Sequence, residues 1–295
     1  MSHAWRADNA PASTETERQA PWSQLPAAPL TLEGAAVLHQ VMRLRLREWR
    51  ELPAARRSAM AEAAAAWLAD AEARQDGQSA VYSLVGDKGD LLWVHFRPDF
   101  RELHRAQQEM AALELRDWLE PVWSLVSVVE LGLYESTVKL WQELAARGVA
   151  PHSAEWEAEV GQVLERQRKA MLPRLYPRLP DGDWICVYPM NRRRGESKNF
   201  YRAPMPARRT MMREHGETGR RYAERVRQII SACTGLDDWE WAVDLFAADP
   251  VDFKKLVYEM RFDEASADYA EFGPFYIGLR CPASELPRWL ASRVP

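Results

Sequence analysis

The chain has 295 residues, of which 47% are hydrophobic and 28% are charged, and its net charge at pH 7 is -4. Because a typical domain has roughly 100 to 150 residues, this length predicts two packed units or one duplicated unit. The balanced charge excludes a globally basic surface, so neither a nucleic-acid partner nor an anionic membrane surface is expected.

The cysteines and the apolar runs indicate a cytoplasmic protein without a membrane span. Only three cysteines occur, Cys186, Cys233 and Cys281, and no two of them are closely spaced. This favours a reducing compartment and argues against a zinc or iron-sulfur site. No apolar run approaches the roughly 18 residues that cross a bilayer, and the N-terminus lacks the apolar core of a signal peptide.

The first half of the chain alternates predicted strands and helices after a polar beginning. Residues 1–29 are rich in Ala, Pro, Ser, Thr and Glu and lack apolar periodicity, which is typical of a disordered tail. Hydrophobic periodicity and breaker residues predict the elements that follow. They are a strand over 32–41, helices over 44–73 around Pro53, a hairpin of strands 80–85 and 90–96 joined by Gly86-Asp87-Lys88-Gly89, a helix from Pro98 to about 110, and a strand over 123–131.

The second half repeats this order of strand, helices, two strands, helix and strand. The repeat includes a proline after each hairpin, in Arg97-Pro98-Asp99-Phe100 and in Asp249-Pro250, and it predicts duplication of one α+β unit. Helices would cover one sheet face of each unit and the twin would cover the other, so the barrel-like interior is a candidate ligand cavity. The predicted elements are a strand over 184–189, helices within 206–227, strands over 228–232 and 239–246, a helix from Pro250 to about 260, and a strand over 275–281.

A helical segment is predicted between the two halves. Residues 135–172 carry Trp141, Leu144 and Trp156 among charged residues, which favours a surface helical connector or an oligomer contact. The expected organisation is a disordered tail over 1–29, a first domain over 30–134, a connector over 135–180 and a second domain over 181–295.

His215 differs from the other histidines because Gly216 and Gly219 follow it in a predicted helix. Because glycine has no side chain, a planar group can approach the helix backbone closely at these positions. The alternative is a surface or core histidine whose glycines serve helix packing. No second His, Cys or carboxylate stands at the spacing of a zinc site, whereas one imidazole suffices for iron when a porphyrin supplies four nitrogens.

Tyr188 lies in a predicted apolar strand and is followed closely by Arg192, Arg193 and Arg194. A strand tyrosine is usually part of the core, and a run of arginines is usually a solvated surface. The functional interpretation is that the phenol gives up an electron and a proton together, while the arginines hold carboxylates. Phosphate binding is a rival interpretation for the arginines, but the Gly-rich spacing of a P-loop is absent.

The combination of these motifs resembles the coproheme decarboxylases of the chlorite dismutase superfamily, in the form found in Firmicutes. The resemblance runs from about Thr31 to Arg280 and is densest from Trp184 onward. Ala35-Ala36 and Gln40 stand where the family commonly has Trp-Tyr and Asp, so changed packing of the first domain is expected. The motifs are Leu30-Thr31-Leu32-Glu33-Gly34, Val126-Ser127-Val128-Val129-Glu130-Leu131, Tyr188-Pro189-Met190-Asn191-Arg192-Arg193-Arg194, Met212-Arg213-Glu214-His215-Gly216-Glu217-Thr218-Gly219-Arg220, Gln228-Ile229-Ile230-Ser231, Leu236-Asp237-Asp238-Trp239-Glu240-Trp241 and Tyr258-Glu259-Met260-Arg261-Phe262-Asp263-Glu264.

The resemblance implies two ferredoxin-like α+β domains whose sheets form a β-barrel, with the active site in the C-terminal domain and a homopentamer as the usual assembly. It implies that His215 is the iron ligand and that Tyr188 is the redox-active tyrosine. Arg192 takes the place of a lysine that contacts a reactive propionate, although Arg and Lys are not interchangeable in carboxylate geometry. The remaining implied contacts are Met190 and Gln228 in the distal pocket, and Tyr134, Arg174, Arg261 and Ser266 at the propionates.

The activity that the resemblance implies is decarboxylation of Fe-coproporphyrin III (coproheme), which is both substrate and redox cofactor. Hydrogen peroxide would drive loss of carbon dioxide from two propionates through a Tyr188 radical, and heme b would be the product. A transient contact with the coproporphyrin ferrochelatase is a further implication. Two alternatives stay open: a heme carrier or sensor, which would not need Tyr188, and a chlorite-decomposing enzyme, which would have an arginine where this chain has Gln228.

Overall fold

The computed structural model describes residues 22–180 and 182–293, and the first half of the chain has the predicted order of elements. Asp99 begins the helix that follows the hairpin, because its carboxylate accepts hydrogen bonds from the backbone N–H groups of Arg101 and Glu102. The elements are β1 (Thr31–Leu44), α1 (Leu46–Glu51), α2 (Ala54–Ala73), β2 (Ser79–Val85), β3 (Leu91–Arg97), α3 (Phe100–Ala111) and β4 (Leu119–Gly132).

The second half has the same order, which confirms the predicted repeat, and it adds short elements that the periodicity did not indicate. These additions are α8 (Glu264–Ala267), β8 (Ala270–Phe272) and α9 (Leu286–Ala291). The repeated elements are β5 (Trp184–Arg192), α6 (Met205–Arg221), β6 (Arg227–Ala232), β7 (Trp241–Ala247), α7 (Val251–Met260) and β9 (Tyr276–Arg280).

Each half forms an antiparallel sheet with the same strand order, β4-β1-β3-β2 in the first half and β9-β5-β7-β6 in the second. Equivalent strands therefore hold equivalent places, as the expected pair of ferredoxin-like units requires. Two further pairings, β2 with β9 and β4 with β6, join the edges of the two sheets. The ring of pairings returns to its start, so the expected barrel is confirmed and its eight strands have no free edge.

The interior of the barrel is filled by side chains from both halves. Val37, Val94, Val187 and Phe246 belong to one buried apolar cluster there. Inside the barrel His39 of β1 and Asp244 of β7, both 0% exposed, are joined by a contact of 2.8 Å between Nε2 and Oδ1. The expectation that this interior is the ligand cavity is therefore wrong, because packed side chains occupy it.

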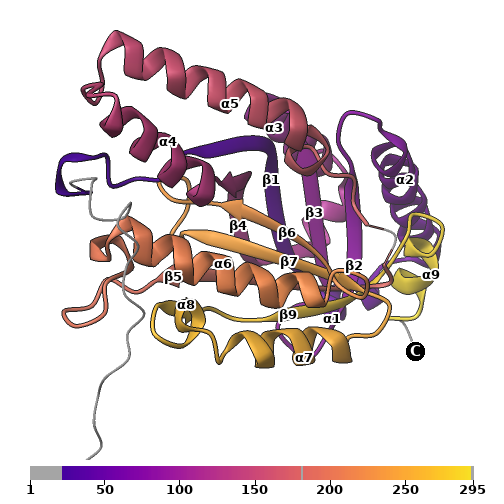
Figure 1. Ribbon diagram of the computed structural model, residues 1–295. Helices are drawn as coiled ribbons and strands as arrows, with labels where there is room; N and C mark the ends of the chain where they lie inside the picture. Colours follow the sequence, from indigo (N-terminus) through magenta and orange to yellow (C-terminus); the bar gives the residue numbers. More distant parts are fainter. Residues whose placement is uncertain (1–21, 181, 294–295) are drawn as a thin grey trace, which may run out of the picture.

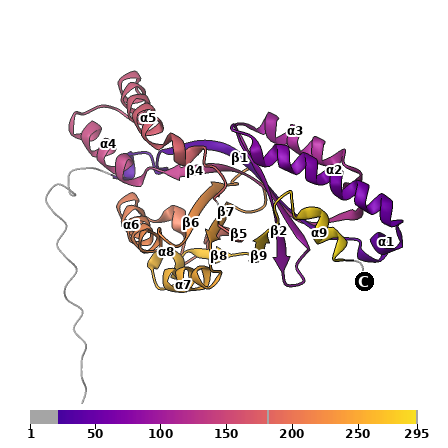
Figure 2. The same cartoon turned by 90° about the vertical axis from the view of Figure 1, so that its right-hand side faces the viewer.

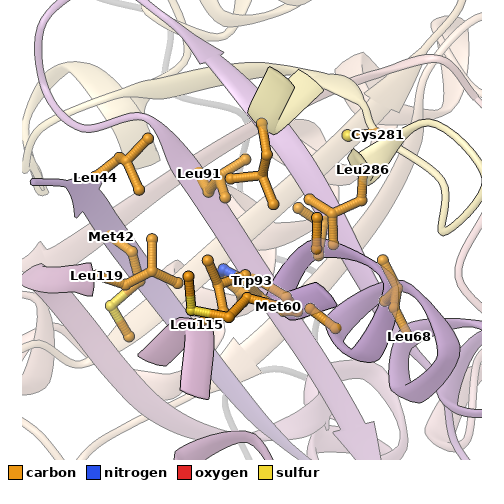
Figure 3. Close-up of a cluster of buried hydrophobic side chains, with 14 of the residues drawn as sticks. Met42, Leu44, Met60, Leu68, Leu91, Trp93, Leu115, Leu119, Cys281 and Leu286 are labelled. Atoms are coloured by element: carbon orange, nitrogen blue, oxygen red, sulfur yellow. The ribbon is translucent and has the colours of Figure 1, made fainter. Parts of the chain in front are cut away.

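The outer face of the first half carries a second apolar core, which lies under α2 and α9 (Figure 3). Leu91 and Trp93 of β3 are 0% exposed and gather there with Met60 of α2 and Leu286 of α9. Figure 2 shows α2 and α3 on one side of the strands, with α6, α7 and α8 around the second half. The last helix of the chain thus stabilises the first unit.

Two helices form the segment between the halves, α4 (Tyr134–Ala146) and α5 (Ala154–Leu175), which confirms its helical character. They project from the barrel at the upper left of Figure 1. Gly34 of β1 approaches the end of α5 so closely that a Cβ there would overlap the carbonyl of Leu175. Within residues 22–180 and 182–293, no helix combines the length and apolar character needed to cross a membrane.

The chain before β1 differs from the expected disordered tail in its last residues. Trp22–Gln24 form a short 3-10 helix, and Trp22 and Leu25 pack against the core of α4 and α5. Trp141 of α4 donates a hydrogen bond of 3.2 Å from Nε1 to the carbonyl of Pro26. The apolar side chains of residues 22–30 complete a core that the two helices alone would leave partly exposed. Residues 1–21, for which a disordered tail was also expected, lie outside the described residues.

Candidate functional site

The strand β5 brings three of the candidate residues to one face of the sheet. Because side chains alternate along a strand, Tyr188, Met190 and Arg192 point to the same side. Gln228 of β6 shares this side, since its partner in β7, Leu245, is also the partner of Cys186 in β5. Leu245 and Cys186 belong to the apolar cluster outside the barrel. The candidates therefore lie on the outer face of the second half, across which α6 lies in Figure 1.

The face of α6 that meets the sheet carries Met212, His215 and Gly219. These residues are three or four positions apart and so lie on one side of a helix. Met212 Sδ is 3.3 Å from a guanidinium nitrogen of Arg192, and a Cβ at Gly219 would lie 3.1 Å from Nε2 of Gln228. The side chains of Gln228 and Met260 pack against Gly219, so this glycine allows close helix packing in the structure, and the approach of a flat ligand stays a prediction. In this structure Gln228 donates to the Gly219 carbonyl at 3.4 Å, so a planar ligand would enter by replacing this contact.

His215 is held by a carboxylate that the sequence did not single out. Its Nδ1 lies 2.9 Å from Oδ2 of Asp263, and Ser266 Oγ lies 3.4 Å from the same nitrogen. Burial alone would raise the pKa of Asp263, but hydrogen bonds from His215 and Ser266 bring it below its usual value. The charged carboxylate fixes Nδ1 as the protonated nitrogen, and Nε2 is then the nitrogen that can bind a metal.

Tyr188 is 4% exposed and lies among aromatic rings. Its ring stacks on Phe275 with the centroids 4.4 Å apart, and Phe272 is 5.8 Å away. Burial raises the pKa of the Tyr188 phenol above its usual value, and the charges of Arg261 and Arg192 oppose this shift in part. The phenol therefore stays protonated at physiological pH. It can be oxidised only if its proton leaves with the electron.

Arg192 is a buried cation at the end of β5, with an exposed fraction of 8%. Its guanidinium donates to the carbonyl of Ala265 at 2.9 Å and lies over the ring of Phe200 at 4.8 Å. Burial lowers its pKa, but an arginine remains charged. The carboxylate of Glu240 accepts a hydrogen bond of 2.6 Å from the backbone N–H of Arg192 and not from its guanidinium. The side-chain charge is therefore available to a ligand.

The other carboxylate-binding candidates differ in how near they lie to the site. Tyr134 begins α4 and packs beside Met212 in a cluster next to the site. Arg261 is exposed and its guanidinium lies 4.1 Å from the ring centroid of Phe272, which also contacts Tyr188. Ser266 turns toward His215. Arg174 lies in the last turn of α5, where its guanidinium contacts Met171 Sδ at 3.8 Å, and the described contacts do not join it to the other candidates.

Two residues of the candidate site, Asp263 and Glu240, belong to the sequence motifs but had no predicted role. Asp263 precedes the short helix α8 and caps it by accepting from the backbone N–H of Ser266. This capping pattern was the one local signal, but nothing in the sequence linked it to a histidine 48 positions earlier. Glu240 is 5% exposed and lies between β6 and β7, where it fixes the backbone of Arg192.

The donor set fits an iron tetrapyrrole that carries carboxylates. Across the described residues, no group of three or more His, Cys, Asp or Glu side chains is placed to hold a metal ion. One oriented imidazole suffices for iron when a porphyrin provides the remaining nitrogens. Gly219 leaves the α6 backbone uncovered on the side of the sheet, so a flat ring would reach it once Gln228 moves away, and the buried guanidinium of Arg192 suits an anionic substituent.

The fold and the site together define a class of protein, a barrel of two ferredoxin-like units with a histidine-bearing helix over the outer face of the second unit. The family described as chlorite dismutase matches residues 56–281. The chain belongs to the chlorite dismutase family.

Relatives and a solved structure agree with this assignment. A Thermus thermophilus protein named coproheme decarboxylase is 41% identical over 252 residues, which cover 84% of this chain and 90% of that protein. A putative heme-binding protein of Halobacterium salinarum is 41% identical over 272 residues, or 91% of this chain and 52% of that protein, so the chain spans about half of its length. A solved structure, described as a novel heme-binding protein from Thermus thermophilus, has a TM-score of 0.76 and 38% identity, covering 91% of this chain and 99% of that one.

Proposed function

We propose that this protein is a coproheme decarboxylase, which uses hydrogen peroxide to convert two propionates of Fe-coproporphyrin III to vinyl groups and so forms heme b. The observation that carries the proposal is the placement of a buried phenol, Tyr188, and a buried cation, Arg192, on one sheet face under the helix of His215. The identity to relatives named coproheme decarboxylase supports it.

His215 would hold the iron through Nε2, while Asp263 keeps the imidazole oriented and its other nitrogen protonated. The bound iron porphyrin, with hydrogen peroxide, supplies the oxidising equivalents. Met190 and Gln228 would line the opposite face of the ring, since they share the sheet face that α6 covers.

Tyr188 would act as the relay between the oxidant and a propionate. Its apolar surroundings keep the phenol protonated, so it gives up its electron and proton together and becomes a radical. The radical takes a hydrogen atom from the β-carbon of a propionate, which then loses carbon dioxide and one more electron to become a vinyl group. Each propionate gives up two electrons, which reduce one peroxide to two waters. Two peroxides are therefore consumed for each heme b.

Arginines would position the carboxylates, because a buried anion needs charge-assisted hydrogen bonds to offset its lost hydration. Arg192, which is buried close to Tyr188, would hold the reacting propionate. Tyr134 and Ser266 would bind carboxylates beside it, and the exposed Arg261 and Arg174 would contact those nearer the solvent. Orienting the reacting carbon near the phenol contributes far more to the rate than added affinity.

Localisation, assembly and substrate delivery belong to the same proposal. We infer a cytoplasmic enzyme, assembled as a homopentamer, that receives coproheme in a transient contact with the ferrochelatase. Sedimentation of the purified protein tests the assembly separately from the chemistry.

Mass spectrometry of the porphyrin tests the reaction directly. Purified protein with coproheme and peroxide should yield a porphyrin that has lost two carboxyl groups. Tyr188→Phe should bind coproheme with unchanged affinity and form heme b at least about a hundredfold more slowly, because the phenol hydrogen is missing. His215→Ala should instead change the visible spectrum of the bound iron.

Other results would point elsewhere. Binding of coproheme without any loss of carboxyl groups would indicate a carrier or sensor, and rapid oxygen release from chlorite would indicate the chlorite-decomposing activity. Normal conversion by Tyr188→Phe would reject the radical role.

A further inference from the structure

Arg208 is a second buried cation in the same region as Arg192. It lies on α6, seven residues before His215, and is 4% exposed. Two helical turns separate these positions, so both side chains lie on the same side of α6, about 10 Å apart along its axis. Neither the resemblance nor the spacing of motifs singled it out.

The contacts of Arg208 leave its positive charge without a carboxylate. One terminal nitrogen of its guanidinium donates to the carbonyl of Ala27, in the packed segment before β1. Its Nε is buried and has no hydrogen-bond partner. Within residues 22–180 and 182–293 no ion pair joins Arg208 to an acidic side chain, whereas Arg213 and Arg221 of the same helix pair with Glu217 and Glu259.

Tyr134 links Arg208 to the site. Tyr134 is half-buried, and burial together with the nearby carboxylate of Glu130 raises the pKa of its phenol, while the charges of Arg208 and Arg192 and a hydrogen bond with Arg208 oppose the shift. Two guanidinium groups thus act on one phenol, and Arg192 also acts on Tyr188. Tyr134 also packs in one cluster with Met212 of α6, whose Sδ lies 3.3 Å from the guanidinium of Arg192, and this contact joins Tyr134 to the outer face of the second half.

Arg192 and Arg208 are both buried, and no ion pair joins either guanidinium to a carboxylate among the described residues. Burial of an unpaired cation is unfavourable unless an anion binds it. A carboxylate is suited to this place, because the planar fork of arginine matches its two oxygens and the tyrosine hydroxyl can donate a further hydrogen bond. We propose that Arg208, with Tyr134 and Arg192, forms a subsite that binds one of the propionates removed in the reaction. This inference rests on the proposed function, since it assigns a substrate group to that same site.

The segment before β1 has a part in this subsite. The carbonyl of Ala27 holds the outer side of the Arg208 guanidinium, and Trp141 holds that segment through the carbonyl of Pro26. The guanidinium is therefore positioned before substrate binds, which reduces the entropy lost on binding.

Titration with coproheme and with heme b, followed by visible absorbance, tests the subsite without any turnover. Arg208→Gln should weaken coproheme binding roughly tenfold to a hundredfold, the usual effect of losing a hydrogen bond to a charged group. It should leave heme b affinity within about twofold, because the product lacks the carboxylate concerned. Arg208→Lys keeps the charge and loses the fork, so an intermediate loss is expected. Arg213→Gln, on an exposed part of α6, is the matched control and should change neither affinity.

Two measurements separate this role from a structural one. If Arg208 only fastens the segment before β1, Arg208→Gln will lower the unfolding midpoint of the ligand-free protein and leave coproheme affinity unchanged, which overturns the proposal. An equal loss of affinity for coproheme and heme b also overturns it.

The subsite and the proposed function can fail separately. Equal binding by the native protein and Arg208→Gln, with normal decarboxylation, rejects the subsite alone. A selective loss of coproheme affinity in a protein that performs no decarboxylation supports the subsite and rejects the activity.

Discussion

The outer faces of the two half-barrels have the same strand order and opposite character. In the first half, Leu91 and Trp93 of β3 are fully buried against α2 in an apolar core. In the second half, the corresponding face presents Tyr188, Arg192 and Gln228 beneath α6. One copy of the duplicated unit thus contributes stability while the other carries chemical groups.

The covering helices account for this difference. Ala61 and Ala64 of α2 are buried, and their small side chains allow close packing on large apolar side chains. Helix α6 also approaches its sheet closely, at Gly219, but it presents His215 and Arg208 on the same side. The close contact serves packing in both halves, and in our proposal a flat ligand displaces Gln228 from Gly219 in the second half.

Trp93→Ala tests whether the outer face of the first half contributes mainly to stability. Loss of a fully buried tryptophan removes apolar burial and leaves a cavity, so the free energy of unfolding should fall by about 3 to 5 kcal/mol. Chemical denaturation measures this change, and Tyr258→Ala, at a residue 58% exposed, is the control. Coproheme affinity of the folded variant should be unchanged. A large loss of affinity would show that the two faces are not independent.

Asp263→Asn tests whether the outer face of the second half contributes mainly to ligand binding. Asparagine still caps α8, but it removes the negative charge beside Nδ1 of His215. Affinity for coproheme should fall about tenfold to a hundredfold, with little change in stability. Absorbance titration measures the affinity, with Glu264→Gln in the same helix as the matched control. Unaltered coproheme affinity would mean that the Asp263 carboxylate does not orient the imidazole of His215 for iron binding.

His95→Gln should change the pH dependence of stability. Burial, assisted by Arg97 and His39, lowers the pKa of His95 to about 3. The unfolded chain takes up this proton near its ordinary pKa of about 6.5, and the folded protein does not, so stability falls as pH drops from about 6.5 toward 3. The slope from this residue is at most about 1.4 kcal/mol per pH unit.

Denaturation at several pH values between about 7 and about 4, within that window, measures the slope. Glutamine cannot titrate, so the variant should lose stability less steeply than the native protein. His104→Gln, at an exposed position of α3, should leave the slope unchanged. If stability falls equally steeply with pH in His95→Gln and in the native protein, His95 is not the source of this pH dependence.

Periodicity and breaker residues predicted most of the strands and helices because both are local properties. The apolar runs of β1 and β3, the glycines of the hairpin after β2 and the proline before α3 all lie within a few residues of what they determine. The repeat of these elements also predicted the barrel. The site residues on β5 and α6 came from motifs, and the structure brings Tyr188, Met190, Arg192, His215 and Gln228 to one face.

Contacts between distant parts of the chain could not be predicted in this way. The pairing of His39 with Asp244 joins residues 205 positions apart, and it lies in an interior that the sequence indicated as a cavity. Alternation shows that a strand has two faces but does not identify the one that binds a ligand. The hydrogen bond from Arg208 to the carbonyl of Ala27 spans 181 positions. Composition alone does not distinguish residues 22–29 from the polar sequence before them, so their packing could not be predicted.

The two edge pairings, β2 with β9 and β4 with β6, also limit how the gene can be divided. A fragment that ends between the halves would expose two unpaired backbone edges and tend to self-associate. Coexpressed fragments could instead find each other by the same hydrogen bonds, which makes the junction near residue 180 a natural point for a split reporter of tetrapyrrole supply.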